Sequence, residues 1–261
     1  MDLSAIDAAL RQAVGQSRTV DDHVTPAAVE RLAVTLDSGE PVPASGDPLP
    51  WGWHAVFCLK APARAELEAD GLPVRFDQIP PVPMQRRLFG GARLTFHTPL
   101  LIGQPVRCES ELIDVKTRST AGAHLAIATL RHRFSGPGGL AVEEEQDIIH
   151  MEPVGNAAEK PAANPAPMLA PTWQRHFTPD PVMLFRFSAL TFNSHRIHYD
   201  APYSADVEKL PGLMVQGRLI SLQLLETVRV RAPKARLQRF EYRSGSPLFV
   251  GGACALNARL D

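Results

Sequence analysis

The sequence predicts an α+β fold in two similar halves, each built as an antiparallel sheet wrapped around a helix. Three observations predict it: strand-like alternation before residue 152, a proline-rich stretch that divides the chain, and a helix that is apolar on almost every face. The 261 residues are 44% hydrophobic and 21% charged, with a net charge of -1. This globular balance gives no overall attraction to nucleic acid or to an anionic membrane.

The first fifteen residues, MDLSAIDAALRQAVG, predict an amphipathic helix. They carry Asp2 and Asp7 instead of a basic and then apolar leader, and no run in the chain approaches 18 apolar residues. Cys58, Cys108 and Cys254 lie far apart, without the close spacing of thiolate metal sites or redox pairs. We therefore expect a protein of the reducing cytoplasm that is not inserted in a membrane.

Four segments before residue 152 alternate apolar and polar residues, with glycine or proline at the breaks: ARLTFHTPL, VRCESELIDVKTR, HLAIATLRHRFSG and LAVEEEQDIIHM. The alternation predicts an antiparallel sheet with one face in water. Residues 152–171 are rich in proline, alanine and asparagine and have no periodicity, which is typical of a linker. We therefore place one domain at residues 1–152, a linker at 153–171 and a second domain at 172–261.

Three pairs of segments recur in the same order on the two sides of the linker. Residues 25–37 resemble 178–193, residues 50–60 resemble 211–223, and residues 96–103 resemble 242–251. The first pair, TPAAVERLAVTLD and TPDPVMLFRFSALTFN, predicts two helices with threonine at the N-cap and proline at the first helical position. Three matches in register predict an internal duplication.

The second helix of the second half, GLMVQGRLISLQLLETV, has only Arg218 and Glu226 as charged residues and should be buried all round. A buried helix wrapped by an antiparallel sheet describes the hotdog fold, and two copies describe a double hotdog. The chain ends ten residues after Gly251, whereas the first half continues through long strands beyond its matching glycine. We therefore expect the second sheet to be truncated by about two or three strands, which would leave edge groups open to association.

Residues 189–200, ALTFNSHRIHYD, gather two histidines, an asparagine, an arginine and an aspartate in an apolar neighbourhood. Such a loop could be a metal site, a catalytic loop or a polar turn. His195 and His198 could pair as metal ligands, but no cysteine or carboxylate cluster in the sequence completes a ligand set. We expect no metal and consider the loop a candidate for acid–base chemistry, because histidine titrates nearest to neutral pH.

The stretch FRFSALTFNSHRIHYD, followed by GLMVQGRLI, resembles the MaoC-like hydratases, and among them the double-hotdog branch of itaconyl-CoA and mesaconyl-C4-CoA (3-methylfumaryl-CoA) hydratases. In the first half, LPWGWHAVF and PPVPMQRRLFGGARLTFHTPLLIG resemble the N-terminal domain of that branch, so the likeness covers about residues 20–251. The family motif is D-x-N-P-x-H. Asn193 stands at its aspartate position and His198 at its histidine position. His195 and Arg196 replace the asparagine and the proline, as in the N-x-H-R-I-H-Y-D of the closer branch.

The resemblance implies a cofactor-independent hydratase that adds water to an α,β-unsaturated acyl-CoA, with itaconyl-CoA giving citramalyl-CoA in itaconate degradation. His198 would act as the base and then the acid, and Asn193, which cannot take a proton, would orient the water. Gly217, at the glycine of the family's H-G-M-L stretch, would let the thioester approach the backbone N–H groups of the buried helix. Tyr199 and Asp200 would fix the imidazole or be structural.

A dicarboxylic substrate would need a cation in the pocket, and arginine suits a carboxylate because it makes two parallel hydrogen bonds. The candidates are Arg86, Arg87, Arg196 and Arg218. A basic stretch after the buried helix is a candidate site for the CoA phosphates and contains Arg229, Arg231, Lys234 and Arg236. Asp37 ends the first half's helix where Asn193 ends the second's, and no histidine follows Asp37 in SGEPVPASGD. We therefore expect one active site per chain, with the first half non-catalytic.

Several alternatives stay open at this point. Gly217 could serve only close helix packing, the basic stretch could be a solvated turn, and Trp51, Trp53 and Phe57 are expected in the core. The chain could also be a mesaconyl-C4-CoA hydratase, a (3R)-hydroxyacyl-thioester dehydratase, a hotdog thioesterase or a non-catalytic acyl-CoA-binding subunit. In each case we expect an acyl-CoA thioester ligand, no nucleic-acid partner, and a homodimer or higher homo-oligomer.

Overall fold

The computed structural model of the protein describes residues 2–76, 78–84, 86–120, 123–153 and 170–259. Its α-helices are α1 (Leu3–Ala13), α2 (Pro26–Leu36), α3 (Pro181–Leu190), α4 (Ala201–Asp206) and α5 (Gly217–Arg231). Its strands are β1 (Ser17–His23), β2 (Arg86–Phe96), β3 (Pro105–Ser119), β4 (Ala123–Gly136), β5 (Gly139–Pro153), β6 (Trp173–Phe177), β7 (Arg239–Arg243) and β8 (Cys254–Ala258). Most of the predicted linker, 153–171, lies outside the described residues.

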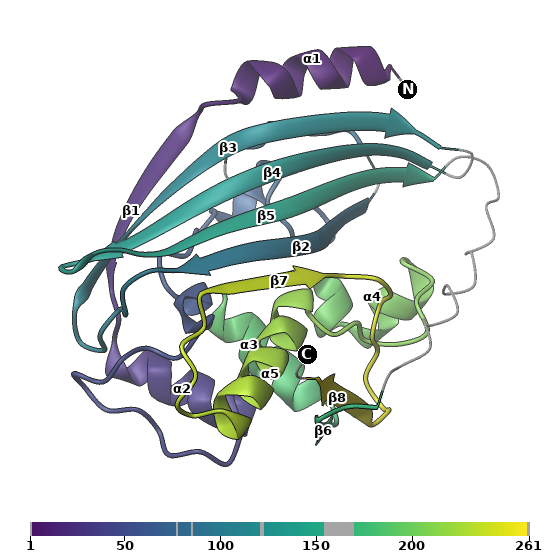
Figure 1. Ribbon diagram of the computed structural model, residues 1–261. Coiled ribbons are helices and arrows are strands. Elements are labelled where there is room, and N and C mark those ends of the chain that lie inside the picture. Colours follow the sequence, from purple (N-terminus) through teal and green to yellow (C-terminus); the bar gives the residue numbers. More distant parts are fainter. Residues whose placement is uncertain (1, 77, 85, 121–122, 154–169, 260–261) are drawn as a thin grey trace.

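A six-stranded antiparallel sheet runs in the order β1-β3-β4-β5-β2-β7, and β6 pairs with β8 in a separate two-stranded sheet. Figure 1 shows the large sheet curving over α3 and α5, while α1 lies along β3. The predicted double-hotdog class is confirmed. As expected, the second half contributes fewer strands than the first among the described residues: β6, β7 and β8 against β1 to β5.

The large sheet is continuous across the two halves of the chain, because β7 of the second half pairs with β2 of the first. Gly91 faces Arg243 in this pairing and has a φ of 156°. A Cβ at Gly91 would collide with the backbone carbonyl of Tyr242, so only glycine lets the two strands approach here. The expected pair of separate sheets is therefore replaced by one shared sheet and a small satellite.

The helices α2 and α3 pack against each other and begin differently from the prediction. Thr25 is the N-cap of α2, but its side chain makes no capping hydrogen bond. The predicted N-cap of the second helix, Thr178, is wrong: α3 begins at Pro181 and its N-cap is Asp180. The Asp180 carboxylate accepts from the Met183 N–H at 2.7 Å, and an ionised acceptor competes well for an unpaired helix-terminal donor.

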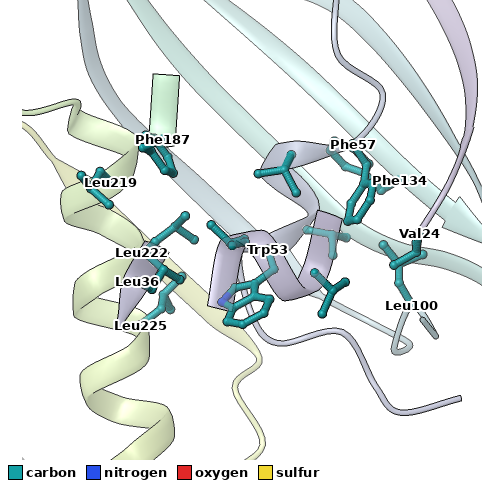
Figure 2. Packing of buried hydrophobic residues seen from close by; sticks show 14 of the residues in the cluster. Val24, Leu36, Trp53, Phe57, Leu100, Phe134, Phe187, Leu219, Leu222 and Leu225 are labelled. Carbon is teal, nitrogen blue, oxygen red and sulfur yellow. The ribbon is translucent and has the colours of Figure 1, made fainter. Parts of the chain in front are cut away.

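The buried helix predicted in the second half is confirmed as α5, which packs into the main hydrophobic core. Figure 2 shows Leu222 and Leu225 of α5 beside Trp53 of the first half, with Leu219 farther along the helix. The indole Nε1 of Trp53 also donates to the buried Glu226 carboxylate at 3.0 Å. The expected counterpart of α5 in the first half, residues 50–60, forms only a short 3-10 helix, η1 (Trp53–Val56). The sheet therefore wraps one long central helix.

A second core lies under α1, where Ile6, Leu10 and Ala13 pack with apolar side chains of β3 and β4 such as Leu112 and Leu130. Burying a leucine or isoleucine side chain contributes roughly 1.5–3 kcal/mol, which explains why the amphipathic first helix stays on the body of the protein. Within the described part of the chain, every helix is too short or too polar to span a bilayer.

Candidate active site

One cavity of about 620 Å³ is lined by residues of both halves of the chain. The loop that follows α3 supplies Asn193, His195 and His198, and the N-terminus of α5 supplies Gly217 and Arg218. A cavity of this size fits an acyl chain with part of its carrier. The structure thus brings together the loop and the helix end that the sequence predicts for the chemistry.

His198 is neutral at physiological pH and has one defined tautomer. It lies in the short helix η3 (Arg196–His198), 7% exposed, and its Nδ1 is 2.7 Å from the Met214 carbonyl oxygen. A carbonyl only accepts, so Nδ1 carries the proton and donates it. Burial lowers the pKa of His198 to about 4, against the opposing effect of the Met214 bond. The unprotonated Nε2 is therefore the basic atom of a residue that lines the cavity.

His195 packs edge-on against His198, with their ring centroids 5.4 Å apart. Its Nε2 is 3.8 Å from an oxygen of Asp70. Burial lowers the pKa of His195 to about 3, with smaller contributions from His198 and Arg87. Two neutral imidazoles therefore lie side by side in the wall of the cavity. No group of three or more histidine, cysteine or acidic residues among the described residues is arranged to hold a metal ion.

The side-chain oxygen of Asn193 forms a hydrogen bond within the loop. Its Oδ1 accepts from the His195 N–H at 3.1 Å, and its own backbone N–H donates to the Ser188 carbonyl at 2.8 Å. The side-chain Nδ2 is the atom left for a water or a substrate. Phe192, just before it, has a φ of 51°, the left-handed conformation that Asp37 shows at the end of α2. By this conformation Asp37 corresponds to Phe192. The repeat alignment had instead placed Asp37 opposite Asn193.

A loop of the first half, at Asp70 and Gly71, is hydrogen-bonded to the histidine loop that follows α3. Ser194 Oγ donates to the Gly71 carbonyl at 2.5 Å, and the Arg196 N–H donates to the Asp70 carbonyl at 2.8 Å. Gly71 has a φ of 87°, and a Cβ there would collide with the Ser194 carbonyl. The close approach of these two loops therefore depends on glycine at position 71.

Gly217 begins α5, and the N-cap residue before it, Gln216, makes no side-chain capping bond. The first N–H groups of a helix have no acceptor within the helix, and the helix dipole favours negative charge there. These donors can therefore stabilise an oxyanion in the cavity. A Cβ on Gly217 would lie 3.0 Å from Cδ1 of Phe89, so a larger residue would crowd both this side chain and the cavity.

Arg218 is ion-paired with a carboxylate that the sequence reasoning missed. Its Nη2 contacts Oε1 of Glu144, which is 1% exposed on β5, and Oε2 of Glu144 accepts from Nε2 of His54 at 2.9 Å. Burial alone would raise the pKa of Glu144, but the positive Arg218 and the bond from His54 outweigh it and lower that pKa. Because Glu144 balances its charge, Arg218 is a weaker candidate for a substrate carboxylate than expected.

Of the other predicted cations, Arg86 and Arg87 both line the cavity. Arg87 Nη1 donates to the Pro73 carbonyl at 2.9 Å, and its guanidinium lies over the Phe76 ring. Burial lowers the pKa of Arg87. No carboxylate of the described chain is within ion-pair distance of it, so its charge is free to meet an anionic ligand.

Three predicted substrate-binding residues, Arg196, Tyr199 and Asp200, lie outside the cavity lining. Arg196 is paired with Asp200 at 2.8 Å and stacks over Tyr203, so it braces the loop instead of facing a ligand. Asp200 is the N-cap of α4 and accepts from the Tyr203 N–H. Tyr199 is 45% exposed and donates to the Ser194 carbonyl. In this arrangement the polar groups of all three contact the protein itself.

The basic stretch predicted for the CoA phosphates also lies away from the cavity lining. Arg229 is bound to the buried carboxylate of Glu226. The exposed members of the stretch are Arg231, Lys234 and Arg236. A 15-residue helix is about 22 Å long, so they lie at the opposite end of α5 from Gly217. The cations that do line the cavity are Arg18, Lys60, Arg86, Arg87 and Arg218.

The first half contributes more chemistry to the cavity than its sequence indicated. Cys108, Ser110 and His132 line the cavity from β3 and β4, and Ser110 Oγ is 2.7 Å from Nδ1 of His132. The alternation on β3 does place Cys108 and Ser110 on one face, which is a usable signal. Strand register makes His132 the cross-strand partner of both Ser110 and Glu144. The periodicity of a single strand does not predict register.

A curved antiparallel sheet around one buried helix, with a histidine loop and a helix N-terminus at a shared cavity, defines the MaoC-like double-hotdog class. Within it, the chain belongs to the hydroxyacyl-thioester dehydratase type 2 family, whose model matches residues 52–250. The chain is 40% identical over 238 residues to a mesaconyl-C(4)-CoA hydratase of Chloroflexus aurantiacus, covering 90% of this chain and 84% of the relative. It is 28% identical to the mitochondrial hydroxyacyl-thioester dehydratase type 2 of Schizosaccharomyces pombe, covering 88% and 85%.

Solved structures agree on the fold. A MaoC-like dehydratase from Phytophthora capsici has a TM-score of 0.65 at 15% identity, covering 95% of this chain and 86% of that one. A Mycobacterium tuberculosis protein described as a double hotdog has a TM-score of 0.54 at 16% identity, covering 92% and 82%. At these identities the likeness shows the architecture alone.

Proposed function

We propose that the protein is a hydratase that adds water to an unsaturated dicarboxylic acyl-CoA, with mesaconyl-C4-CoA as the first candidate and itaconyl-CoA as the second. Citramalyl-CoA is the product in both cases, but the double bond of itaconyl-CoA lies one carbon beyond conjugation with the thioester and has to shift into conjugation before water adds. The observation that carries the proposal is the neutral, tautomerically fixed His198 beside Asn193 and the N-terminus of α5 in one cavity. The 40% identical mesaconyl-C(4)-CoA hydratase supports the order of the two substrates.

The reaction follows from the positions of these groups. A water held by the Asn193 amide gives a proton to Nε2 of His198 as its oxygen attacks the β-carbon. The electron pair of the double bond moves toward the thioester oxygen, and the first N–H groups of α5 stabilise the resulting enolate. His198 then returns the proton to the α-carbon, so the enzyme ends in its starting state. The double bond of mesaconyl-C4-CoA is conjugated with the thioester, as this sequence of steps requires.

Arg87 is the residue we assign to the free carboxylate of the substrate. It lines the cavity, and the two carboxylates that act on it, those of Asp70 and Glu68, are not within ion-pair distance. A buried guanidinium gains most from a ligand that restores charge balance. The neutral acyl chain of crotonyl-CoA could not provide that interaction, so the proposal implies a preference for dicarboxylic substrates.

The test is turnover of pure protein with mesaconyl-C4-CoA, itaconyl-CoA and crotonyl-CoA in water enriched in ¹⁸O, followed by liquid chromatography and mass spectrometry. We expect labelled citramalyl-CoA, formed fastest from mesaconyl-C4-CoA, and a loss of about 10²–10⁴-fold in His198→Gln. Hydration of crotonyl-CoA alone would contradict the substrate class. Ligand binding without turnover would indicate a non-catalytic acyl-CoA-binding subunit.

A second candidate is dehydration of (3R)-hydroxyacyl thioesters, which the family match and the Schizosaccharomyces pombe relative favour. The same groups would act in the reverse direction, because water addition and elimination share one transition state. Incubation with straight-chain (3R)-hydroxyacyl-CoA separates the two candidates. Faster dehydration of that substrate than hydration of mesaconyl-C4-CoA would favour the dehydratase.

A further inference from the structure

Two cysteines that the sequence placed far apart lie together in the wall of the cavity. Cys58 and Cys108 both line it, and Cys58 Sγ is 3.7 Å from the carbonyl oxygen of Val20. Val20 of β1 is the cross-strand partner of Cys108 on β3, so the Cys58 thiol, which bonds to Val20, lies beside Cys108. Both thiols are free, and their closeness comes from the fold and is not visible in their spacing along the chain.

Cys108 has neighbours that favour its ionised form. Its Sγ is 3.6 Å from Oγ of Ser110, which in turn is 2.7 Å from Nδ1 of His132. This chain gives the thiol proton a path through a hydroxyl to an imidazole nitrogen. The hydrogen bond from Cys58, followed by the effects of His132 and Ser110, lowers the pKa of Cys108 to about 5, although burial acts in the opposite direction.

Cys58 has the opposite surroundings. Its thiol lies between the Val20 carbonyl oxygen and the Cys108 sulfur, and either acceptor keeps the proton on Cys58. The carboxylate of Asp22 accepts from the Cys58 N–H at 2.8 Å, and this negative charge also disfavours a second thiolate. The pKa of Cys58 is therefore raised. The Cys58 proton is bonded to a carbonyl, whereas Cys108 has a hydroxyl and an imidazole beside it, which favours Cys108 as the thiol that ionises.

We propose that Cys108 is a nucleophilic site in the cavity wall that captures α,β-unsaturated carbonyl compounds by conjugate addition, with Cys58, Ser110 and His132 as its positioning residues. The Cys108 proton passes through Ser110 to His132, and the thiolate sulfur bonds to the β-carbon of the acceptor. The electron pair of the double bond moves to the α-carbon, which takes one proton back from His132. The net change is addition of S–H across C=C, and neither oxidant nor reductant is needed.

The delivery of such a compound by an acyl-CoA rests on the proposed function, whereas the reactivity of the thiol does not. An unsaturated thioester that enters the cavity for hydration presents the same electrophilic β-carbon to water and to Cys108. Hydration would normally win, because His198 and the α5 N-terminus act on that route. Thioether formation would then be a slow side reaction that inactivates the enzyme during turnover.

The first experiment uses N-ethylmaleimide, a conjugate acceptor without CoA, on the full native chain at pH 6. Peptide mass mapping reports the rate at Cys108 relative to Cys254, a half-buried cysteine outside the cavity lining. We expect Cys108 to react about tenfold faster, since its gain in thiolate exceeds its loss of intrinsic nucleophilicity. Burial alone predicts the reverse, because Cys108 is only 3% exposed. Equal or faster labelling of Cys254 overturns the proposal.

Two variants test the positioning residues. Cys58→Ala removes the S–H donor and should slow labelling of Cys108 at pH 6 by about tenfold, shifting its pH profile upward. Cys58→Ser keeps a donor and should restore most of the rate, which a purely steric role would not require. Unchanged labelling in Cys58→Ala contradicts the role of Cys58, and the wild-type ratio of Cys108 to Cys254 still decides the main proposal.

The second experiment incubates the protein with mesaconyl-C4-CoA and follows intact mass. We expect a slowly growing species heavier by the whole acyl-CoA, absent from Cys108→Ser. No adduct after many turnovers, with maleimide labelling intact, would refute capture of acyl-CoA while leaving the hydratase standing. No turnover with rapid maleimide labelling would instead count against the proposed function alone.

Discussion

Glu144 on β5 and Arg218 on α5 form an ion pair inside the cavity, so a buried charge of one half of the chain is paired with a charge of the other half. His54 adds a hydrogen bond to the same carboxylate at 2.9 Å. Gly217, next to Arg218, is the residue whose neighbouring N–H groups we assign to the oxyanion. The position of that helix end is therefore held by a contact from the first half of the chain.

Replacing Glu144 with glutamine should destabilise the protein strongly. The change leaves the largely buried Arg218 without its counter-ion, which typically costs about 3–5 kcal/mol. The measurement is the free energy of unfolding from urea titration. Glu143→Gln is the matched control, since the neighbouring Glu143 makes a partly exposed pair with Arg133 and should cost under about 1 kcal/mol. Equal losses in the two variants would contradict a buried ion pair.

The pH dependence of kcat/KM should report the low pKa of His198. The base must be unprotonated, so activity falls as the pH drops through about 4 and is level from about 5 to 8. This follows from burial, which penalises the charged imidazole. The profile should be measured over short assays with stability checked at each pH. An acidic limb near 6.5 would show that His198 is solvated in the free enzyme and that the burial argument is wrong.

Gly217→Val should lower kcat by at least about a hundredfold, because the new side chain separates the thioester from the helix N–H groups. Gly217→Ala brings a Cβ to 3.0 Å from Phe89 and should have a smaller effect. The double variant Gly217→Ala with Phe89→Leu distinguishes the two roles. Full recovery of kcat in it would mean that glycine serves helix packing, and continued loss would favour the oxyanion assignment.

Arg87→Met should raise KM for mesaconyl-C4-CoA by about tenfold to a hundredfold, the effect of losing one charge-assisted hydrogen bond. The KM for crotonyl-CoA, which has no carboxylate to lose, should change little. Arg231→Met is the control for the basic stretch at the far end of α5, and we expect it to leave both values unchanged. A rise in KM for every CoA substrate in Arg231→Met would restore that stretch as a phosphate site.

The hydrophobic periodicity of the sequence predicted most helices and strands correctly. Where a prediction was wrong, contacts within the folded protein explain the difference. The amphipathic α1, the buried α5 and the alternating strands before residue 152 were all readable, because each depends on the periodicity of its own residues. The N-cap at Asp180 was missed because Thr178 and Asp180 both precede a proline. Residues 50–60 match α5 in sequence but form only η1, which lies between two residues with positive φ, Gly52 and Cys58.

In the candidate site, the loop with Asn193, His195 and His198 could be predicted from the sequence. The residues that contact this loop and line the rest of the cavity could not. Arg196 was expected to face the substrate, yet Asp200 is one helical turn away and captures its guanidinium. The closeness of Cys58 and Cys108 depends on contacts of Cys58 with Val20 and Asp22 of β1, which spacing along the chain does not encode. Charge and chemistry are visible in a sequence, whereas the partner that neutralises or activates a group is a property of the fold.

The pairing of β7 with β2 has a consequence for how the molecule comes apart. Strands of both halves share one hydrogen-bonded ladder, and Trp53 and Leu222 share one core. Neither half can therefore melt without exposing the backbone edge and the apolar face of the other. Heating should produce a single transition, and a chain severed between residues 153 and 170 should still behave as one particle in gel filtration.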